Sequence, residues 1–207
     1  MQHCITAFNR LERSYPPIGR YDTIRSDKNG NIVSAHGKPN CFADHEIVEI
    51  HPIVRETTCD GIPVKFSERN KAIIQQQATR GCTTAATAML IHDAGKSFNG
   101  QLLSRTNLGN DTSMCREITS AGLQPRVHKN IELENLDQLL QEHGSAIVSI
   151  FDQMGVAGHV VVVDEITESG IRLRDPYHGW EITVSHDAFK RCYQKCDSII
   201  TVSHSPE

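Results

Sequence analysis

The chain has 207 residues, enough for one well-packed domain or for one domain with a modest extension. Its hydrophobic content of 38% and its charged content of 22% are those of an ordinary soluble globular protein. A net charge of -4 provides no overall basic surface, so we do not expect nucleic acid as the main partner. No apolar run approaches the length of a membrane-spanning helix, and the N-terminus lacks a signal-peptide core. We expect a soluble protein without membrane insertion, cytoplasmic or secreted without a signal peptide.

The cysteines of the chain do not follow a disulfide pattern. There are seven, an odd number, at irregular spacing: Cys4, Cys41, Cys59, Cys82, Cys115, Cys192 and Cys196. In a chain of this size, such cysteines are typical of a protein that is kept reduced. Most reduced cysteines are buried and inert, whereas a reactive one needs neighbours that stabilise its thiolate. The surroundings of each cysteine therefore decide whether it can act as a nucleophile.

Residues 1–70 differ in character from the rest and are expected to form a β-rich extension. Asn29-Gly30 lies between two apolar runs and predicts a hairpin, because this dipeptide favours the turn that joins antiparallel strands. A second hairpin is expected to begin with the apolar run from Ile47, to turn at Asp60-Gly61 and to return from Ile62, with Pro52 as a proline of the kind found in edge strands. We therefore expect the extension over residues 1–70 and the main domain over residues 71–207.

The segment after residue 70 places helices first and strands second. Helical patterns cover residues 82–94, about 111–121 and 133–140, with Asp111 or Thr112 as the expected N-cap of the second helix. Strand patterns follow at residues 146–151, 158–166, 171–174, 181–184 and 198–202, with a short helix over about 185–196 before the last of them. This order predicts an α+β fold in which a helix that begins at Cys82 packs on a mainly antiparallel sheet.

Cys82 has the surroundings expected of a nucleophile. It stands in the first turn of the predicted helix, where unpaired backbone N–H groups and the positive end of the helix dipole favour a thiolate. Gly81 before it permits the bend of a loop-to-helix elbow. Gln76, six residues upstream, can place its side-chain amide beside the backbone N–H of Cys82. The two donors would form an oxyanion hole for a tetrahedral intermediate.

A thiolate that attacks an acyl carbon needs a histidine to protonate the leaving group, and a third residue to orient that histidine. His159 opens a strand of four consecutive valines, where a polar ring is expected if it faces a cleft. Asp175 ends the next strand, and an antiparallel return brings it to the same edge of the sheet. A plain two-residue turn would place Asp175 opposite Val162, so contact with His159 requires a bulge or a longer loop.

Together these residues resemble the papain-like cysteine peptidases, in particular the bacteriocin-processing (double-glycine leader) peptidases and the effector cysteine proteases of plant-pathogenic bacteria. The resemblance covers about residues 75–203 and rests on the segments Gln76…Gly81-Cys82, Gly158-His159-Val160, Asp175-Pro176 and Gly179. It implies a papain-like fold and a thiol protease or amidase that acts on a protein or peptide without a cofactor. It also implies four roles: nucleophile for Cys82, general acid and base for His159, orienting carboxylate for Asp175, and oxyanion donor for Gln76. An effector of this kind would be a virulence protein that enters a host cell.

Two other functions remain open because the residues around Cys82 depart from the family pattern. The peptidases usually have Asp before the cysteine and Gly after it, whereas Arg80-Gly81 precede Cys82 here and Thr83 follows it. Protein glutamine deamidases and transglutaminase-like effectors use the same triad on side-chain amides. A module that keeps the fold only for binding is the second alternative, since a cysteine in an alanine-rich helix is commonly a small buried residue.

Three of the four catalytic assignments have a competitor within the sequence. His178 is the rival base and Asp164 the rival orienting carboxylate, while Gln75 and Gln77 compete with Gln76 as the oxyanion donor. An Asp-Pro pair after a strand is also a common turn without any catalytic role.

No metal or phosphate site is expected. Histidines and cysteines gather loosely in two places, at Cys192, Cys196, His186 and His204, and at His36, Cys41, His45 and His51. Neither group has the tight spacing of a zinc knuckle, and with 11 histidines in the chain such groupings arise easily. The stretch Gly95-Lys96-Ser97 lacks the upstream glycine of a phosphate-binding loop.

Overall fold

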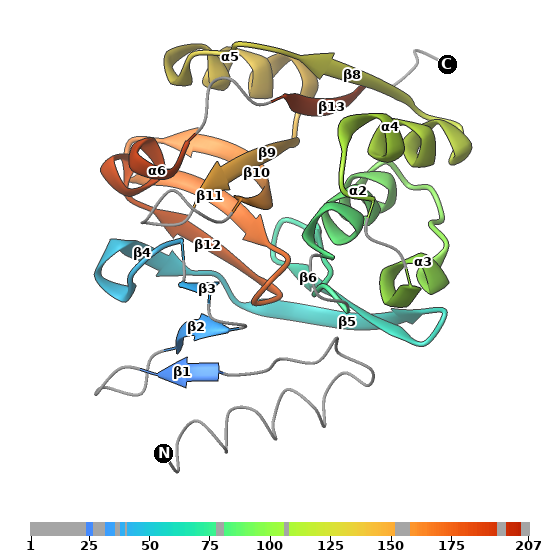
Figure 1. Cartoon of the computed structure of the whole chain (residues 1–207), viewed down its shortest axis with the longest axis horizontal. Helices are drawn as coiled ribbons and strands as arrows, with labels where there is room; N and C mark the ends of the chain where they lie inside the picture. The colour runs from blue at the N-terminus through green and yellow to red at the C-terminus, as the bar shows by residue number, and fades with distance from the viewer. Residues whose placement is uncertain are drawn as a thin grey trace.

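The structure is a computed structural model, and it describes residues 24–26, 32–35, 38–39, 41–77, 81–105, 108–151, 158–193 and 198–203. Its largest sheet contains the strands β4 (Ile47–Ile50), β8 (Gln124–His128), β9 (Ala146–Phe151), β10 (Gly158–Thr167), β11 (Gly170–Asp175), β12 (Trp180–Val184) and β13 (Ile199–Ser203). They lie in the order β4-β12-β11-β10-β9-β13-β8, and neighbouring strands are antiparallel throughout (Figure 1).

Two small sheets and six helical segments complete the described part of the fold. One sheet is formed by β1 (Ile24–Ser26), β2 (Ile32–Ala35) and β3 (Lys38–Pro39), and the other by β5 (Ile53–Cys59), β6 (Ile62–Ser67) and β7 (Ala72–Ile73). The helical segments are the 3-10 helix η1 (Asp44–Glu46) and the α-helices α2 (Cys82–Asp93), α3 (Gly100–Arg105), α4 (Asp111–Ser120), α5 (Leu133–His143) and α6 (His186–Cys192). The predicted α+β class with a mainly antiparallel sheet is confirmed.

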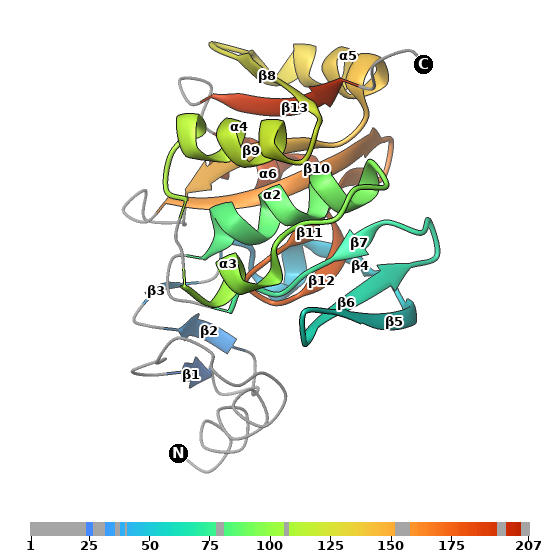
Figure 2. The ribbon, with the colours of Figure 1, turned by 90° about the vertical axis from the view of Figure 1, so that its right-hand side faces the viewer.

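The large sheet is covered on both faces, and this explains the run of valines in β10. Successive side chains of a strand point to opposite faces. Val160 and Val162 pack with α2 in one buried cluster, whereas Val161 and Val163 pack with α5 and α6 in the other. Figure 2 shows α2, α3 and α4 together on one side of these strands. A strand buried on both faces has no polar face, so the alternating pattern of a half-exposed strand is lost.

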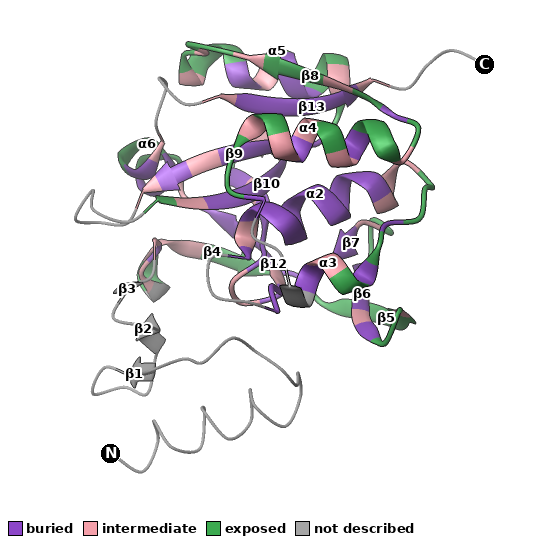
Figure 3. Cartoon of the chain, turned by 45° about the vertical axis from the view of Figure 1, so that its right-hand side comes forward, coloured by how far each residue is buried: buried purple, intermediate pink, exposed green. Residues whose placement is uncertain are grey.

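Helix α2 is buried along most of its length, as Figure 3 shows. The run from Thr83 to Ile91 is buried without interruption. Hydroxyl groups suit such a helix only where they find partners, and those of Thr83 and Thr84 accept the backbone N–H groups of Gly109 and Leu108. Small side chains let the helix approach its neighbours closely. The alanine- and threonine-rich sequence therefore belongs to a helix that is packed on several sides.

A β-bulge at Asp164 sets the register between β10 and β11. Val163 pairs with Leu173, but the next pair along the strands is Glu165 with Arg172. Asp164 is therefore the extra residue of β10, and every pair beyond it is shifted by one position.

The bulge decides which face Asp175 occupies. Without it, the two-residue turn would put Asp175 opposite Val162, whereas in the structure Val162 pairs with Arg174. Facing residues of an antiparallel pair share one side of the sheet, so Asp175 comes to the side of Val161 and His159. The prediction that this contact requires a bulge or a longer loop is confirmed.

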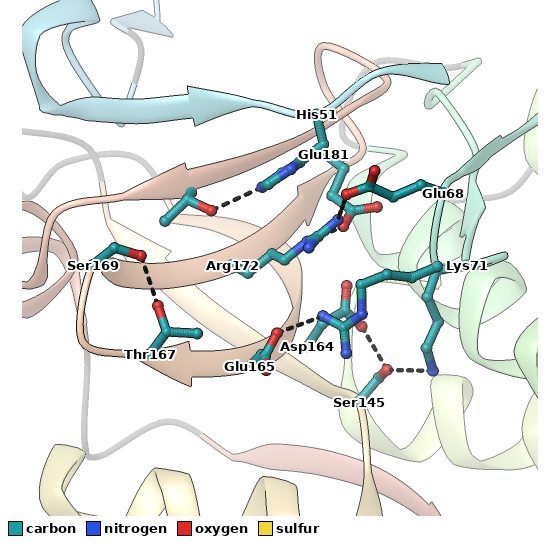
Figure 4. Close-up of polar contacts among 12 residues, drawn as sticks. His51, Glu68, Lys71, Ser145, Asp164, Glu165, Thr167, Ser169, Arg172 and Glu181 are labelled. Atoms are coloured by element: carbon teal, nitrogen blue, oxygen red, sulfur yellow. Dashed lines mark hydrogen bonds and ion pairs between the residues drawn. The ribbon is translucent and has the colours of Figure 1, made fainter. Parts of the chain in front are cut away.

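Polar side chains join the small sheet β5-β6-β7 to the large sheet (Figure 4). Arg69 pairs with Glu165 of β10 at 2.8 Å, and Lys71 donates to the hydroxyl of Ser145 at 3.1 Å. That hydroxyl donates in turn to Asp164 at 2.5 Å in a buried bond. The exposed Arg69 pair contributes about 0–1 kcal/mol, and the partly buried bond of Lys71 is a second attachment of the β6–β7 turn.

Both predicted hairpins are present, although the second begins later than expected. β1 pairs with β2, and β5 pairs with β6. The apolar run from Ile47 does not form one strand: β4 ends at Ile50 and β5 begins at Ile53. Pro52 interrupts the run because it has no backbone N–H to donate. β4 joins the large sheet as the neighbour of β12.

The predicted helices are present, but the N-cap of α4 was placed wrongly. The cap is Asn110, whose side chain accepts the N–H of Ser113 at 2.9 Å, and not Asp111 or Thr112. β8 and α3 were not predicted. β8 contains Pro125, which is tolerated because β8 is an edge strand of its sheet. Several residues named from the sequence lie outside the described ones: Cys4, Asn29, Gly30, His36, Arg80, Cys196 and His204.

Residues before position 70 contribute to the same core as α2. The side chains of Ile62, Val64 and Phe66 belong to the buried cluster that contains this helix. A division of the chain at residue 70 stays a prediction. No helix among the described residues is long and apolar enough to span a bilayer.

Candidate active site

Cys82 is the first residue of α2, and Gly81 is the N-cap. Gly81 has a φ of -78° and a ψ of 5°, a conformation open to any residue, so the freedom expected of a glycine elbow is not used. No side chain forms a cap hydrogen bond at this end of the helix among the described residues. The sulfur therefore lies beside the N–H groups and the positive end of the helix dipole.

The thiol of Cys82 meets the ring of His159, which comes from the start of β10. The two side chains are hydrogen-bonded to each other. Burial by itself would raise the pKa of Cys82, but His159 and the backbone N–H groups of Val160 and Thr83 lower the pKa below its ordinary value. The thiolate therefore owes its stability first to His159 and then to the helix start.

His159 is held in turn by Asp175. Nε2 of the ring lies 2.7 Å from Oδ1 of the carboxylate. A carboxylate only accepts hydrogen bonds, so Nε2 carries the proton and Nδ1 is left for Cys82. Burial would lower the pKa of His159, but the charge and hydrogen bond of Asp175, with the hydrogen bond of Cys82, raise it to about 10. The arrangement favours a thiolate–imidazolium pair at neutral pH.

Asp175 binds more than one donor. Its Oδ2 lies 2.7 Å from Nδ1 of His178, and its Oδ1 accepts the backbone N–H of Tyr177 at 2.8 Å. Against the effect of burial, His159 and His178 hold the pKa of Asp175 well below its usual range. His178, the rival base, thus meets the carboxylate, and the ring that meets Cys82 is that of His159.

Asp164, the rival carboxylate, is engaged elsewhere. Nε and Nη2 of Arg174 each lie 2.8 Å from one of its oxygens, and Ser145 donates to it as well. Burial would raise the pKa of Asp164, but the charge and hydrogen bonds of Arg174 lower it. Both of its oxygens are therefore occupied inside the bulge.

The three glutamines before the nucleophile lie against the turn that follows β11. The backbone N–H of Gln76 donates to the carbonyl of Pro176 at 2.8 Å, and Nε2 of Gln75 donates to the carbonyl of Tyr177 at 3.1 Å. Nε2 of Gln77 turns back to the carbonyl of Gln75 at 2.9 Å. Both rivals of Gln76 therefore use their amide nitrogen in bonds within this region.

Gly179 allows the glutamine segment and the turn to approach each other. Its φ is +64°, a value that side chains rarely adopt, and its N–H donates to the carbonyl of Asp175 at 2.9 Å. A Cβ at this position would lie 2.8 Å from Cβ of Gln75. Both the conformation of the turn and its contact with Gln75 therefore require glycine.

The family model for the Peptidase C39 family matches residues 70–207. The chain belongs to this family. Cys82, His159, Asp175 and Gln76 all lie inside the matched segment. The resemblance to papain-like cysteine peptidases that process double-glycine leaders is confirmed, and the chain is a member of a cysteine peptidase family.

Two solved structures of C39-type peptidases share this fold. The peptidase domain of Streptococcus ComA, a bi-functional ABC transporter involved in quorum sensing, is 18% identical with a TM-score of 0.52, over 63% of this chain and 96% of that chain. A C39-like peptidase from Bacillus anthracis is 13% identical with a TM-score of 0.53, over 68% and 98%. A double-glycine-motif protease from an AMS/PCAT transporter, in complex with the leader peptide, is 16% identical with a TM-score of 0.49, over 74% and 98%. No curated protein sequence matches the chain.

Arg174 is the residue of this C39 family member that sequence reasoning missed. Its side chain is fully buried, binds both Asp164 and Asp93, and donates to the carbonyl of Ala72 at 2.6 Å. The available signal was a charged residue inside a strand predicted to be buried, because a buried charge needs a partner. The carboxylate it required was already conspicuous as Asp164, in the neighbouring strand.

The loose groups of histidines and cysteines have other partners in the C39 fold. Nε2 of His51 lies 2.8 Å from the hydroxyl of Thr183, and the thiol of Cys192 donates to the carbonyl of Cys41 at 3.3 Å. Within the part of the chain that the structure describes, no group of three or more ligand-type side chains is placed to hold a metal ion.

Proposed function

We propose that the protein is a thiol peptidase that cleaves peptide bonds with Cys82, His159 and Asp175 as its catalytic triad. The observation that carries the proposal is the hydrogen-bonded series from thiol to imidazole to carboxylate, in a member of a cysteine peptidase family. The direction of the pKa shifts supports it, because the thiol is made more acidic and the imidazole more basic.

The reaction begins when the thiolate of Cys82 attacks the carbonyl carbon of the scissile bond and forms a tetrahedral intermediate. The backbone N–H of Cys82 and the side-chain amide of Gln76 stabilise its oxyanion. The C–N bond then breaks while His159 gives its Nδ1 proton to the leaving amine, which leaves a thioester on Cys82. A water molecule gives a proton to His159 and attacks the thioester, and this step releases the acid and restores the thiolate–imidazolium pair.

The assignment of Gln76 rests on the arrangement of its neighbours. The amide nitrogens of Gln75 and Gln77 each donate to a backbone carbonyl. The backbone of Gln76 is tied to the turn that carries Asp175, through the carbonyl of Pro176. The oxyanion donor and the orienting carboxylate would therefore move as one unit.

The substrate is a protein or peptide whose backbone can enter the site beside α2. We assign the catalytic domain to residues 71–207, with the preceding segment supplying edge strand β4 and the packing of β6 on α2. No cofactor is needed for the chemistry, because the thiol, the imidazole and water supply every proton and bond.

Thiol labelling tests the catalytic role without knowledge of the substrate. Iodoacetamide near pH 6 is expected to label Cys82 much faster than Cys59 or Cys115, because burial raises the pKa of those two thiols. His159→Ala should slow the labelling of Cys82 to the rate of the other two. Labelling of all three at similar rates in the unmodified protein would overturn the proposal.

Mass spectrometry of reduced enzyme with a peptide library identifies the reaction. Cleavage that is lost in Cys82→Ala and kept in Cys115→Ala is the expected result. A mass increase of about 1 Da without cleavage would instead identify a glutamine deamidase. Similar labelling rates for Cys82, Cys59 and Cys115, together with an unchanged library, would favour a module that only binds.

A further inference from the structure

His178 is a second histidine on the carboxylate of Asp175, and no step of the mechanism above uses it. Nδ1 of His178 lies 2.7 Å from Oδ2, while Nε2 of His159 lies 2.7 Å from Oδ1. The carboxylate only accepts, so His178 carries its proton on Nδ1. With the backbone N–H of Tyr177, three donors surround a carboxylate that is 5% exposed.

We infer that His178 is a positioning residue, which locks the carboxylate of Asp175 so that His159 keeps Nδ1 directed at Cys82. The inference rests on the proposed function. A carboxylate turns easily about the bond that joins it to the side chain, since this torsion has a broad minimum. Donors on both oxygens remove that freedom, because any rotation lengthens at least one of the bonds. His159 is then oriented by a fixed acceptor.

The ring of His178 is itself held on more than one side. Its centroid lies 4.4 Å from that of Trp180, with the rings stacked at 29°, and 4.8 Å from that of Tyr177, with the rings at 78°. Its Nε2 is buried and makes no hydrogen bond among the described residues. Packing and the bond to Asp175 therefore set the orientation of the ring, and the ring has no competing hydrogen bond within the described part of the chain.

The charges around Asp175 also favour this role. His159 faces it from β10, and His178 faces it from the turn after β11. Arg174, its neighbour in the chain, directs its guanidinium to Asp93 and Asp164 instead. Within the described residues the two imidazoles are therefore the ionisable partners of the carboxylate. Loss of His178 would leave His159 bound to a carboxylate that has only one imidazole.

A pair of substitutions separates the hydrogen bond from the packing. His178→Phe keeps a ring against Trp180 and removes the donor, whereas His178→Asn keeps an N–H donor at the place of Nδ1 and removes the ring. His186→Asn, on the exposed start of α6, is the matched control. The readout is the pH dependence of iodoacetamide labelling at Cys82.

We expect His178→Phe to raise the midpoint of this labelling profile by about one pH unit, because a less well oriented His159 stabilises the thiolate less. His178→Asn should return the midpoint toward that of the unmodified protein, and the control should not shift it. With a cleavable peptide, His178→Phe should lower kcat about tenfold and leave KM unchanged. If His178 acted through packing alone, the order of the two variants would be reversed: His178→Asn would show the larger shift of the labelling midpoint and the larger fall in kcat.

The outcomes distinguish the inference from the function on which it rests. If His178→Phe keeps the midpoint of the unmodified protein while His159→Ala loses labelling at low pH, the catalytic proposal stands and this inference is overturned. If the unmodified protein lacks the low midpoint, both fail. Nitrogen NMR of the unmodified protein gives a check that needs no variant, since an unprotonated Nδ1 on His178 would also overturn the inference.

Discussion

Substitution of Arg174 by methionine removes the cation at the centre of the buried polar network. The side chain binds Asp164 through two contacts of 2.8 Å, Asp93 at 2.7 Å and the carbonyl of Ala72 at 2.6 Å. Methionine keeps an unbranched apolar stem and makes none of these bonds. Two carboxylates whose side chains are 1% and 8% exposed would then lose their buried counter-ion, and Lys71 would stay 3.7 Å from Asp93.

The loss of stability in Arg174→Met depends on the hydrogen bonds and charges that Asp164 and Asp93 retain. Breaking a buried ion pair on one side costs about 3–5 kcal/mol, because the remaining charge stays in a medium that solvates it poorly. Asp164 retains a bond from Ser145, and Asp93 retains one from the N–H of Ala72 and a longer ion pair with Lys71 at 3.7 Å. We therefore expect the free energy of unfolding at pH 7 to fall by about 4 kcal/mol, a large part of the roughly 5–15 kcal/mol typical of a folded domain.

The loss of unfolding free energy should depend on pH, and the direction of this dependence follows from the pKa of Asp164. Burial would raise the pKa of Asp164, and Arg174 lowers it below its ordinary value. A lowered pKa adds stability above the unfolded value of about 3.9, and this stability is lost as the pH falls through the folded value. Without Arg174 burial prevails and the pKa rises, so the variant can take up a proton. The difference in the free energy of unfolding between the variant and the unmodified protein should be largest near pH 7 and shrink between about pH 6 and pH 4.

Urea unfolding under reducing conditions measures the effect. Trp180 is the single tryptophan and supplies the fluorescence signal, and circular dichroism supplies a second probe. With a slope of about 2 kcal/mol per M, the midpoint should fall by about 2 M. Arg69→Met is the control, because its pair with Glu165 is 34% and 44% exposed and is worth less than about 1 kcal/mol. Equal losses in the two variants, or a deficit that ignores pH, would refute the reasoning.

Three other substitutions or conditions test separate parts of the structure. Gly179→Ala should lower the free energy of unfolding by about 2 kcal/mol and slow the labelling of Cys82, because a Cβ at φ +64° meets Cβ of Gln75 at 2.8 Å; unchanged thermal unfolding would contradict this. Asn110→Ala should cost about 1 kcal/mol through loss of the α4 cap and leave the labelling of Cys82 unchanged. The pKa of His159 rises from 6.5 to about 10 on folding, so its contribution to stability is complete below pH 6.5 and is lost as the pH rises through 10. Thermal unfolding between pH 7 and pH 10 should show this decline in the unmodified protein and not in His159→Ala.

Much of the fold could be predicted because its signals are local. The valines of β10 and the small residues of α2 are legible as elements buried on several sides, and Gly122 and Gly144 mark the ends of helices. The cap of α4 was misplaced by one or two residues because Asn110, Asp111 and Thr112 are all good N-caps. β8 was missed because an edge strand that contains Pro125 has no alternating pattern.

The choice among rival residues depended on contacts between segments distant in the chain. Only the structure showed that Gln75 and Gln77 use their amides on backbone carbonyls, since three adjacent glutamines are equivalent as sequence. Likewise, two histidines near one aspartate have the same chemistry. The position of α2 decides that Cys82 meets His159, while His178 binds the other oxygen of the carboxylate.

The sequence by itself predicted the residue types of the candidate site, the elements that carry them, and the need for a bulge if Asp175 is to contact His159. The tertiary structure alone decided where that bulge lies. Asp164 is the extra residue, and its carboxylate is bound by Arg174 from the facing strand and by Ser145, which directly precedes β9. These bonds join residues distant in the chain, so no local pattern reveals them. A shift of one residue in the register moves every side chain beyond it to the other face.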